Sequence, residues 1–80
     1  MEDHIITQHK GRKLEITRST LYTYDIVFDD AESKVLCFDI DDDINYIVNF
    51  AGQEPSIEAI EIAQIIDPSL DIEAFVLPGQ

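Results

Sequence analysis

The alternation of apolar and polar residues in the middle of the chain predicts a β-hairpin within residues 21–40. Residues 22–28 and 36–40 each alternate with period two, which is typical of a half-buried strand. The acidic, turn-prone residues 29–33 between them suit the connection of a hairpin. We expect the rest of the fold to be organised around this hairpin.

A second hairpin is predicted at residues 5–16. Its turn is placed at Lys10-Gly11, because glycine suits the positive φ of a two-residue type I′ turn. This turn brings the apolar residues of both strands to a common face of the sheet. The expected cross-strand pairs are Ile5 with Ile16, Thr7 with Leu14 and His9 with Arg12.

The four predicted strands have one strongly apolar face and one mixed face, as expected of an antiparallel sheet that is covered on one side. The apolar face holds Ile5, Leu14, Ile16, Tyr22, Tyr24, Ile26, Phe28, Leu36, Phe38 and Ile40. The mixed face holds Ile6, Gln8, Lys13, Glu15, Thr17, Leu21, Thr23, Asp25, Val27, Val35, Cys37 and Asp39.

Residues 44–51 fit two structures, of which we expect a helix. Their apolar residues recur at helical spacing, the aspartates at 41–43 suit an N-terminal cap, and Gly52 suits the end of a helix. A fifth strand is the alternative, because every second residue from 44 to 50 is also apolar.

A longer helix is predicted at residues 56–66. Pro55-Ser56 opens it with proline and a capping serine, and Asp67-Pro68 ends it, because a residue before proline avoids the α region. A polar residue at every third position marks its outer face.

The last apolar stretch, residues 72–77, fits either a further helix or an edge strand. With 80 residues, of which 45% are hydrophobic, the chain has material for one core. We therefore predict a single α+β domain, residues 1–80. Its four-stranded antiparallel meander is covered on one face by one or two C-terminal helices.

The charge of the chain is strongly negative and unevenly distributed. Seventeen acidic and five basic residues give a net charge of −12. Residues 19–80 contain fourteen of the acidic residues and a single basic one, Lys34. Nucleic acids and anionic membranes require a basic surface, so we expect this chain to bind neither directly.

Candidate catalytic and metal-binding patterns in the sequence are weak. The aspartates between 39 and 43 fit an EF-hand loop in neither of two registers, because Ile44 or Tyr46 stands where glycine is required. Cys37 has no basic neighbour in sequence, as an activated thiol requires. We expect no enzyme activity and no cofactor. A single cysteine and an N-terminus without a signal peptide favour the cytoplasm.

The excess of acid predicts a small acidic interaction protein that binds and blocks a basic protein partner, such as a nucleic-acid-binding enzyme or complex. A phage-type inhibitor, a nucleic-acid mimic and an immunity or antitoxin protein are the forms that fit. The alternative is a non-catalytic structural or regulatory module that forms a homodimer through the open sheet face, with charge serving only solubility. The open-face residues expected to contact a second copy are Leu21, Val27, Val35 and Cys37.

Two groups of acidic residues are expected to form the surface that contacts a basic partner. One group lies in the central hairpin loop, and the other follows the second strand of that hairpin. If this strand continues to Asp43, alternate aspartates lie on one face about 6.6 Å apart, a spacing comparable to that of successive phosphates. The predicted contact residues are Asp29, Asp30, Glu32, Asp39, Asp41, Asp42 and Asp43.

Overall fold

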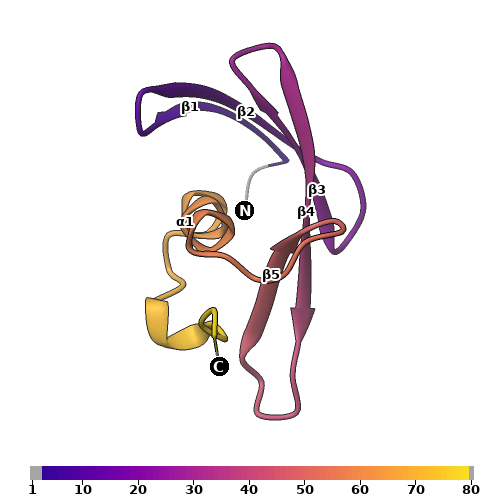
Figure 1. Cartoon of the computed structure of the whole chain (residues 1–80), viewed down its shortest axis with the longest axis vertical. Helices are drawn as coiled ribbons and strands as arrows, with labels where there is room; N and C mark the ends of the chain where they lie inside the picture. The colour runs from indigo at the N-terminus through magenta and orange to yellow at the C-terminus, as the bar shows by residue number, and fades with distance from the viewer. Residues whose placement is uncertain (1–2, 80) are drawn as a thin grey trace.

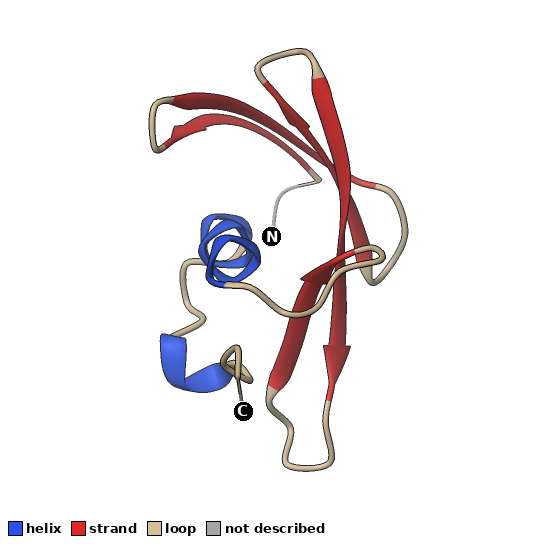
Figure 2. Cartoon of the chain, viewed as in Figure 1, coloured by secondary structure: helices blue, strands red, loops and turns tan. Residues whose placement is uncertain are grey.

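The computed structural model, which describes residues 3–79, is an α+β domain with an antiparallel sheet and one α-helix (Figures 1 and 2). The sheet has five strands in the order β1-β2-β3-β4-β5, so the prediction of a four-stranded meander was one strand short. The elements are β1 (His4–His9), β2 (Arg12–Arg18), β3 (Thr23–Phe28), β4 (Glu32–Ile40), β5 (Tyr46–Phe50), α1 (Ile57–Ile66) and the 3₁₀ helix η1 (Ile72–Ala74).

The N-terminal hairpin, formed by β1 and β2, has the predicted register. Ile5 pairs with Ile16 and His9 with Arg12 across an antiparallel ladder. The turn residues have φ values of 52° at Lys10 and 77° at Gly11. Positive φ at both central positions is what a type I′ turn requires, and glycine adopts it without steric cost.

The prediction of a helix at residues 44–51 was wrong, because this segment contains the fifth strand. In β5, Val48 pairs with Phe38 and Tyr46 with Ile40. Asp41 acts as a turn residue here: its Oδ1 accepts hydrogen bonds from the N–H of residue 43 at 3.0 Å and of residue 45 at 2.8 Å. The carboxylate thus stabilises the β4–β5 loop by the same chemistry that would cap a helix.

The longer helix predicted at residues 56–66 is confirmed as α1. The Ser56 side chain accepts a hydrogen bond from the Ala59 N–H at 3.2 Å, which makes it the N-cap. The helix ends before Asp67-Pro68 as expected, and the tail then forms the single turn of η1. Beyond η1, the tail meets β5 in one parallel bridge between Phe75 and Tyr46.

The core lies between one face of the sheet and α1. In Figure 1, α1 is seen nearly end-on while β4 runs along the long axis of the molecule, so the helix crosses the sheet and covers its middle. The two ends of the long strand β4 therefore lie beyond the helix. The buried residues are Leu14, Ile16, Tyr24, Ile26, Phe28, Leu36, Val48, Phe50, Ala59, Ile60, Ile62, Ala63, Ile66 and Phe75.

Four residues of the predicted apolar face are outside the buried set; Ile5 and Phe38 are half-buried and pack against it, while the other two are largely exposed. Tyr22 is 62% exposed and Ile40 is 52% exposed, although both belong to the apolar series that the sequence indicates. They lie toward the end of the sheet where β4 leads into the β4–β5 loop. Because α1 does not cover this end of the sheet, the apolar side chains of Tyr22 and Ile40 border an open pocket instead.

Candidate functional site

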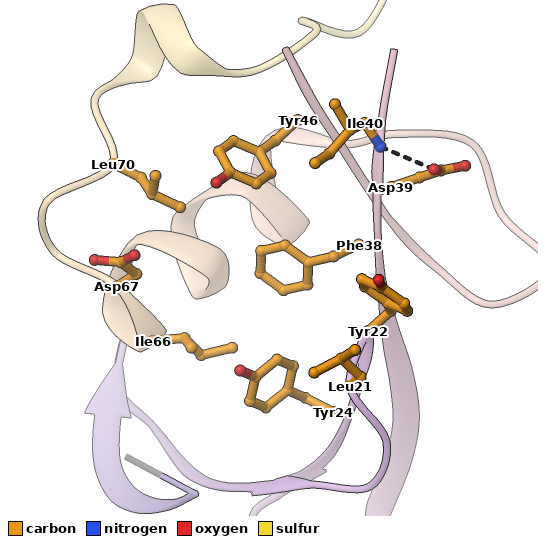
Figure 3. Close-up of a pocket in the computed structure, with 10 residues that line it drawn as sticks. All are labelled: Leu21, Tyr22, Tyr24, Phe38, Asp39, Ile40, Tyr46, Ile66, Asp67 and Leu70. Atoms are coloured by element: carbon orange, nitrogen blue, oxygen red, sulfur yellow. Dashed lines mark hydrogen bonds between the residues drawn. The ribbon is translucent and has the colours of Figure 1, made fainter. Parts of the chain in front are cut away.

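A pocket of about 530 Å³ lies between the uncovered end of the sheet and the segment that follows α1 (Figure 3). The sheet side is formed by residues of β3, β4 and β5 and by the loop before β3, and the opposite side by the end of α1 and its following turn. The lining residues are Leu21, Tyr22, Tyr24, Phe38, Asp39, Ile40, Tyr46, Ile66, Asp67 and Leu70.

Aromatic rings in mutual contact form a continuous row through this region. The ring of Phe38 lies 5.6 Å from that of Tyr24 and 6.4 Å from that of Tyr46, centroid to centroid. The row continues to Phe75, whose ring is 6.0 Å from that of Tyr46. Tilted and edge-on ring contacts of this kind stabilise a fixed arrangement. The wall of the pocket is therefore built from side chains that hold one another in place.

The interior of the pocket is neutral and its rim is acidic. Burial raises the pKa of Tyr24, which favours its neutral hydroxyl. Asp39 and Asp67 lie on opposite sides of the ring cluster (Figure 3). Hydrogen bonds from the side chain and backbone of Ser69, at 2.6 and 3.2 Å, lower the pKa of Asp67. Asp67 is therefore ionised at neutral pH.

The β4–β5 loop continues the acidic rim away from the pocket. We name Asp39 together with Asp41, Asp42 and Asp43 the acidic tip; Asp42 and Asp43 are exposed. Among residues 3–79, no Lys or Arg lies within ion-pair distance of these four carboxylates. Within the same described residues, no three potential ligands are grouped as a metal site.

The geometry of the tip differs from the extended row that the sequence allows. β4 ends at Ile40, and the three following aspartates belong to a loop. The phosphate-like spacing of alternate aspartates therefore does not form. Ile44, in the same loop, is 78% exposed and has a φ of 64°, a region that β-branched residues rarely occupy.

The other predicted acidic group lies at the opposite end of β4 and is paired with cations of the same chain. Arg12 contacts Asp29 and Glu32, each at 3.0 Å, and the Nζ of Lys13 lies 3.2 Å from Asp30. We name these five residues the paired end. The Lys13 backbone N–H and the Arg12 side chain both donate to Asp29, and these bonds lower the pKa of that carboxyl. Three carboxylates here face two cations.

The paired end also covers an aromatic side chain. The guanidinium carbon of Arg12 lies 4.6 Å from the centroid of the Phe28 ring, and Lys34 Nζ lies 5.5 Å from the same ring. Phe28, which also belongs to the core and contacts the ring of Phe50, is only 2% exposed although it lies at the end of its strand. Arg12 therefore both bonds two carboxylates and covers an apolar ring.

The remaining basic residues are paired elsewhere on the molecule. Lys10 contacts Glu61 at 2.9 Å, Lys34 contacts Glu58 at 3.9 Å, and Arg18 contacts Asp3 at 3.7 Å. The two glutamates that the helical pattern places on an outer stripe thus face cations, Lys10 of the β1–β2 turn and Lys34 of β4. Every Lys and Arg of the chain has an acidic partner, and none of them is at the tip.

The open face of the sheet carries fewer of the predicted contact residues than expected. Val35 is 36% exposed, while Val27 and Cys37 are half-buried. Leu21, which the alternation assigns to this face, instead lines the pocket and is 65% exposed. A further exposed residue of the face is Ile6, on β1, at 64%.

The sequence does not indicate the pocket, and it gives no reason to single out Tyr46, Asp67 or Leu70. A usable signal was the mismatch between a ten-residue helix and the longer apolar face beneath it.

Neither helix in the described part of the chain has the length and apolar character needed to cross a bilayer. No protein-family model, no curated protein and no solved structure matches this chain.

Proposed function

We propose that this protein is a small acidic interaction protein that binds and blocks a basic protein partner through the acidic tip. The observation that carries the proposal is the contrast in pairing. All five cations of the chain are engaged by other carboxylates, while none of the residues described contributes a cation to Asp39 or to the three aspartates of the β4–β5 loop.

Charge of this kind acts mainly on association. A cluster of exposed carboxylates attracts a basic surface over distances set by ionic strength, about 8 Å at physiological salt. Rim charges raise the association rate and make it salt-dependent, and they disfavour acidic competitors. A basic nucleic-acid-binding enzyme or complex is the class of partner that such a surface favours.

Paired charge-reversal variants test the proposal. The tip variant is Asp42→Lys with Asp43→Lys, because neither side chain has a described role in holding the loop together. The control is Asp25→Lys with Glu54→Lys, which changes the net charge equally at two exposed positions away from the tip. Asp41 is left unchanged, since its loss would disturb the loop itself.

The measurement is capture of a partner from a lysate at low and high salt, followed by stopped-flow association with the purified partner. We expect the tip variant to slow association roughly tenfold or more, and the control only slightly. Equal slowing by both variants would mean that net charge alone matters and that the tip has no special role.

Self-association through the open face is the second candidate, favoured by the exposure of Ile6 and Val35 on that face. In this case the charge serves solubility, and a homodimer would persist at high salt. Sedimentation at low and high salt distinguishes the two functions. A monomer at all protein concentrations favours partner binding, while a tight dimer that is insensitive to salt favours the second candidate.

A further inference from the structure

We propose that the pocket beside the acidic tip is an anchor site for one bulky apolar side chain, carried by a basic segment of the partner. This inference rests on the proposed function and names the kind of segment that the site binds. Cationic residues on both sides of the apolar residue would lie against Asp67 and the carboxylates of the acidic tip.

The size and lining of the pocket fit such an anchor. Its volume of about 530 Å³ falls in the range of pockets that enclose a ligand. Apart from two aspartates at the rim, the lining consists of aliphatic and aromatic residues. Leu21, Tyr22 and Ile40 are each more than half exposed, so filling the pocket removes apolar surface from water on both partners.

The wall is formed before any partner arrives. The ring of Phe38 is held between those of Tyr24 and Tyr46, and Phe38 is hydrogen-bonded through its backbone N–H to the Tyr22 carbonyl at 2.9 Å. Binding to a preformed pocket loses little conformational entropy. Apolar or aromatic anchors in such pockets usually contribute most of the binding energy of an interface.

The charge of the rim selects a basic segment over other apolar ligands. An anchor flanked by acidic residues would meet Asp39 and Asp67 and be repelled. The paired end of this molecule shows the complementary case, since Arg12 there bonds two carboxylates and covers the ring of Phe28. A flanking arginine of the partner would make the same two kinds of contact at the tip, with carboxylates and with exposed Tyr22.

Three acetylated pentapeptide amides are the probes. The first has tryptophan between two pairs of arginines, the second has alanine in place of tryptophan, and the third has tryptophan between two pairs of glutamates. Because the chain contains no tryptophan, the emission of the peptide reports its own environment. Affinities of all three are measured from backbone amide shifts of the labelled, full-length protein.

The tryptophan–arginine peptide should bind at least about tenfold more tightly than the alanine peptide, with emission shifted to shorter wavelength. The glutamate peptide should bind more weakly than either. Tyr22→Ala with Ile40→Ala should remove the advantage of tryptophan and leave the salt dependence unchanged. Ile6→Ala is the matched control, since it is an exposed strand isoleucine on the other face. Leu21→Ala is a second, independent pocket variant.

The outcomes separate the two proposals. Equal binding of the tryptophan and alanine peptides, with salt-dependent shifts at the tip, would overturn the anchor site and support the proposed function. Tight binding of the glutamate peptide would overturn the basic class of ligand. Absence of any salt-dependent shift at the tip with either arginine peptide would count against the proposed function itself. Circular dichroism of each variant confirms that it is folded.

Discussion

The two ends of strand β4 carry similar numbers of carboxylates and have opposite electrostatic character. At the paired end, Asp29 and its neighbours in the β3–β4 turn bond Arg12 and Lys13 of β2, the strand next to β3 in the sheet. The acidic tip joins β4 to β5, the last strand in the sheet order, and β5 contains no basic residue. The count of acidic residues is therefore a poor guide to available charge, because the strand that lies next to a turn decides whether its carboxylates are free.

The same difference extends to the apolar surface. Both ends of β4 lie beyond α1 (Figure 1), and an aromatic residue lies near each of them, Phe28 beside Glu32 and Tyr22 beside Phe38. At the paired end, cations from β2 and β4 cover Phe28. At the tip end, Tyr22 stays 62% exposed beside the pocket. At the paired end, charge and aromatic surface are thus covered within the molecule. The tip end presents exposed carboxylates and exposed apolar surface together.

The backbone of the two turns differs in strain. At the paired end, positive φ values of 53° and 60° fall on Asp29 and Asp30, a residue type that tolerates this conformation. At the tip, the positive φ of 64° falls on Ile44, which is β-branched and exposed. The tip therefore holds an unfavourable local conformation that a different residue would relieve.

Arg12→Ala should have the largest effect of the changes that test this comparison. It removes the bonds to Asp29 and Glu32 and uncovers the Phe28 ring. We expect the melting temperature to fall by roughly 5 °C or more. The variant should also gain amide shifts at the former paired end when an arginine-rich peptide is added, because two carboxylates there lose their partner.

Lys13→Ala is the control for this change, since Lys13 makes an exposed ion pair with Asp30 and covers no ring. Its melting temperature should change little, because exposed ion pairs contribute little to stability. If the two variants were equally destabilised, the cover that Arg12 provides for Phe28 would have no energetic importance, and the comparison of the two ends would rest on charge alone.

Ile44→Gly should stabilise the protein by about 0.5–1 kcal/mol. Relief of the left-handed conformation contributes about 1–2 kcal/mol, and the greater freedom of glycine in the unfolded chain offsets part of it. Asp30→Gly at the paired end should bring no such gain, because aspartate tolerates positive φ and its pair with Lys13 is lost. Urea unfolding of both variants measures the difference; equal changes would show that Ile44 is not strained.

Much of the fold could be predicted because local patterns and turn chemistry agreed with it. The pairing of Ile5 with Ile16 follows from alternation and from a Lys10-Gly11 turn. The start of α1 follows from Ser56. Residues 44–51 could not be assigned in this way, because an aspartate bonds free N–H groups equally well in a hairpin loop and at a helix start. What decided was the hydrogen-bonded pairing of β5 with β4, which the apolar pattern of residues 44–51 does not show by itself.

Which acidic residues are paired within the chain could not be predicted from the sequence. Asp29 meets Arg12 through the β2–β3 register, a contact between residues 17 positions apart. The pocket depends on the direction in which α1 crosses the sheet, and amphipathic spacing does not carry this information. Tyr22 and Ile40 have the pattern of core residues for that reason, although they remain exposed.

The smallest predicted effect compares the removal of one charge at each end, Asp29→Asn and Asp42→Asn. Near neutral pH, Asp29→Asn should lower the melting temperature, because it loses the charge that Lys13 and Arg12 stabilise. Asp42→Asn should raise it slightly at low salt, because it weakens repulsion within the tip. This second effect should disappear as salt is added, since screening shortens the range of the repulsion.

The decrease in melting temperature caused by Asp29→Asn should disappear as the pH is lowered. These bonds lower the pKa of Asp29 below 3.8, so the native carboxyl binds fewer protons than the unfolded one near that pH. The stability that it contributes is present above the unfolded value and is lost as the pH falls through the lower folded value. The native protein and Asp29→Asn should therefore converge in melting temperature between about pH 5 and pH 2. A constant difference across this range, or shifts of the same sign for both variants at neutral pH, would show that the two ends of β4 do not differ in pairing as the structure indicates.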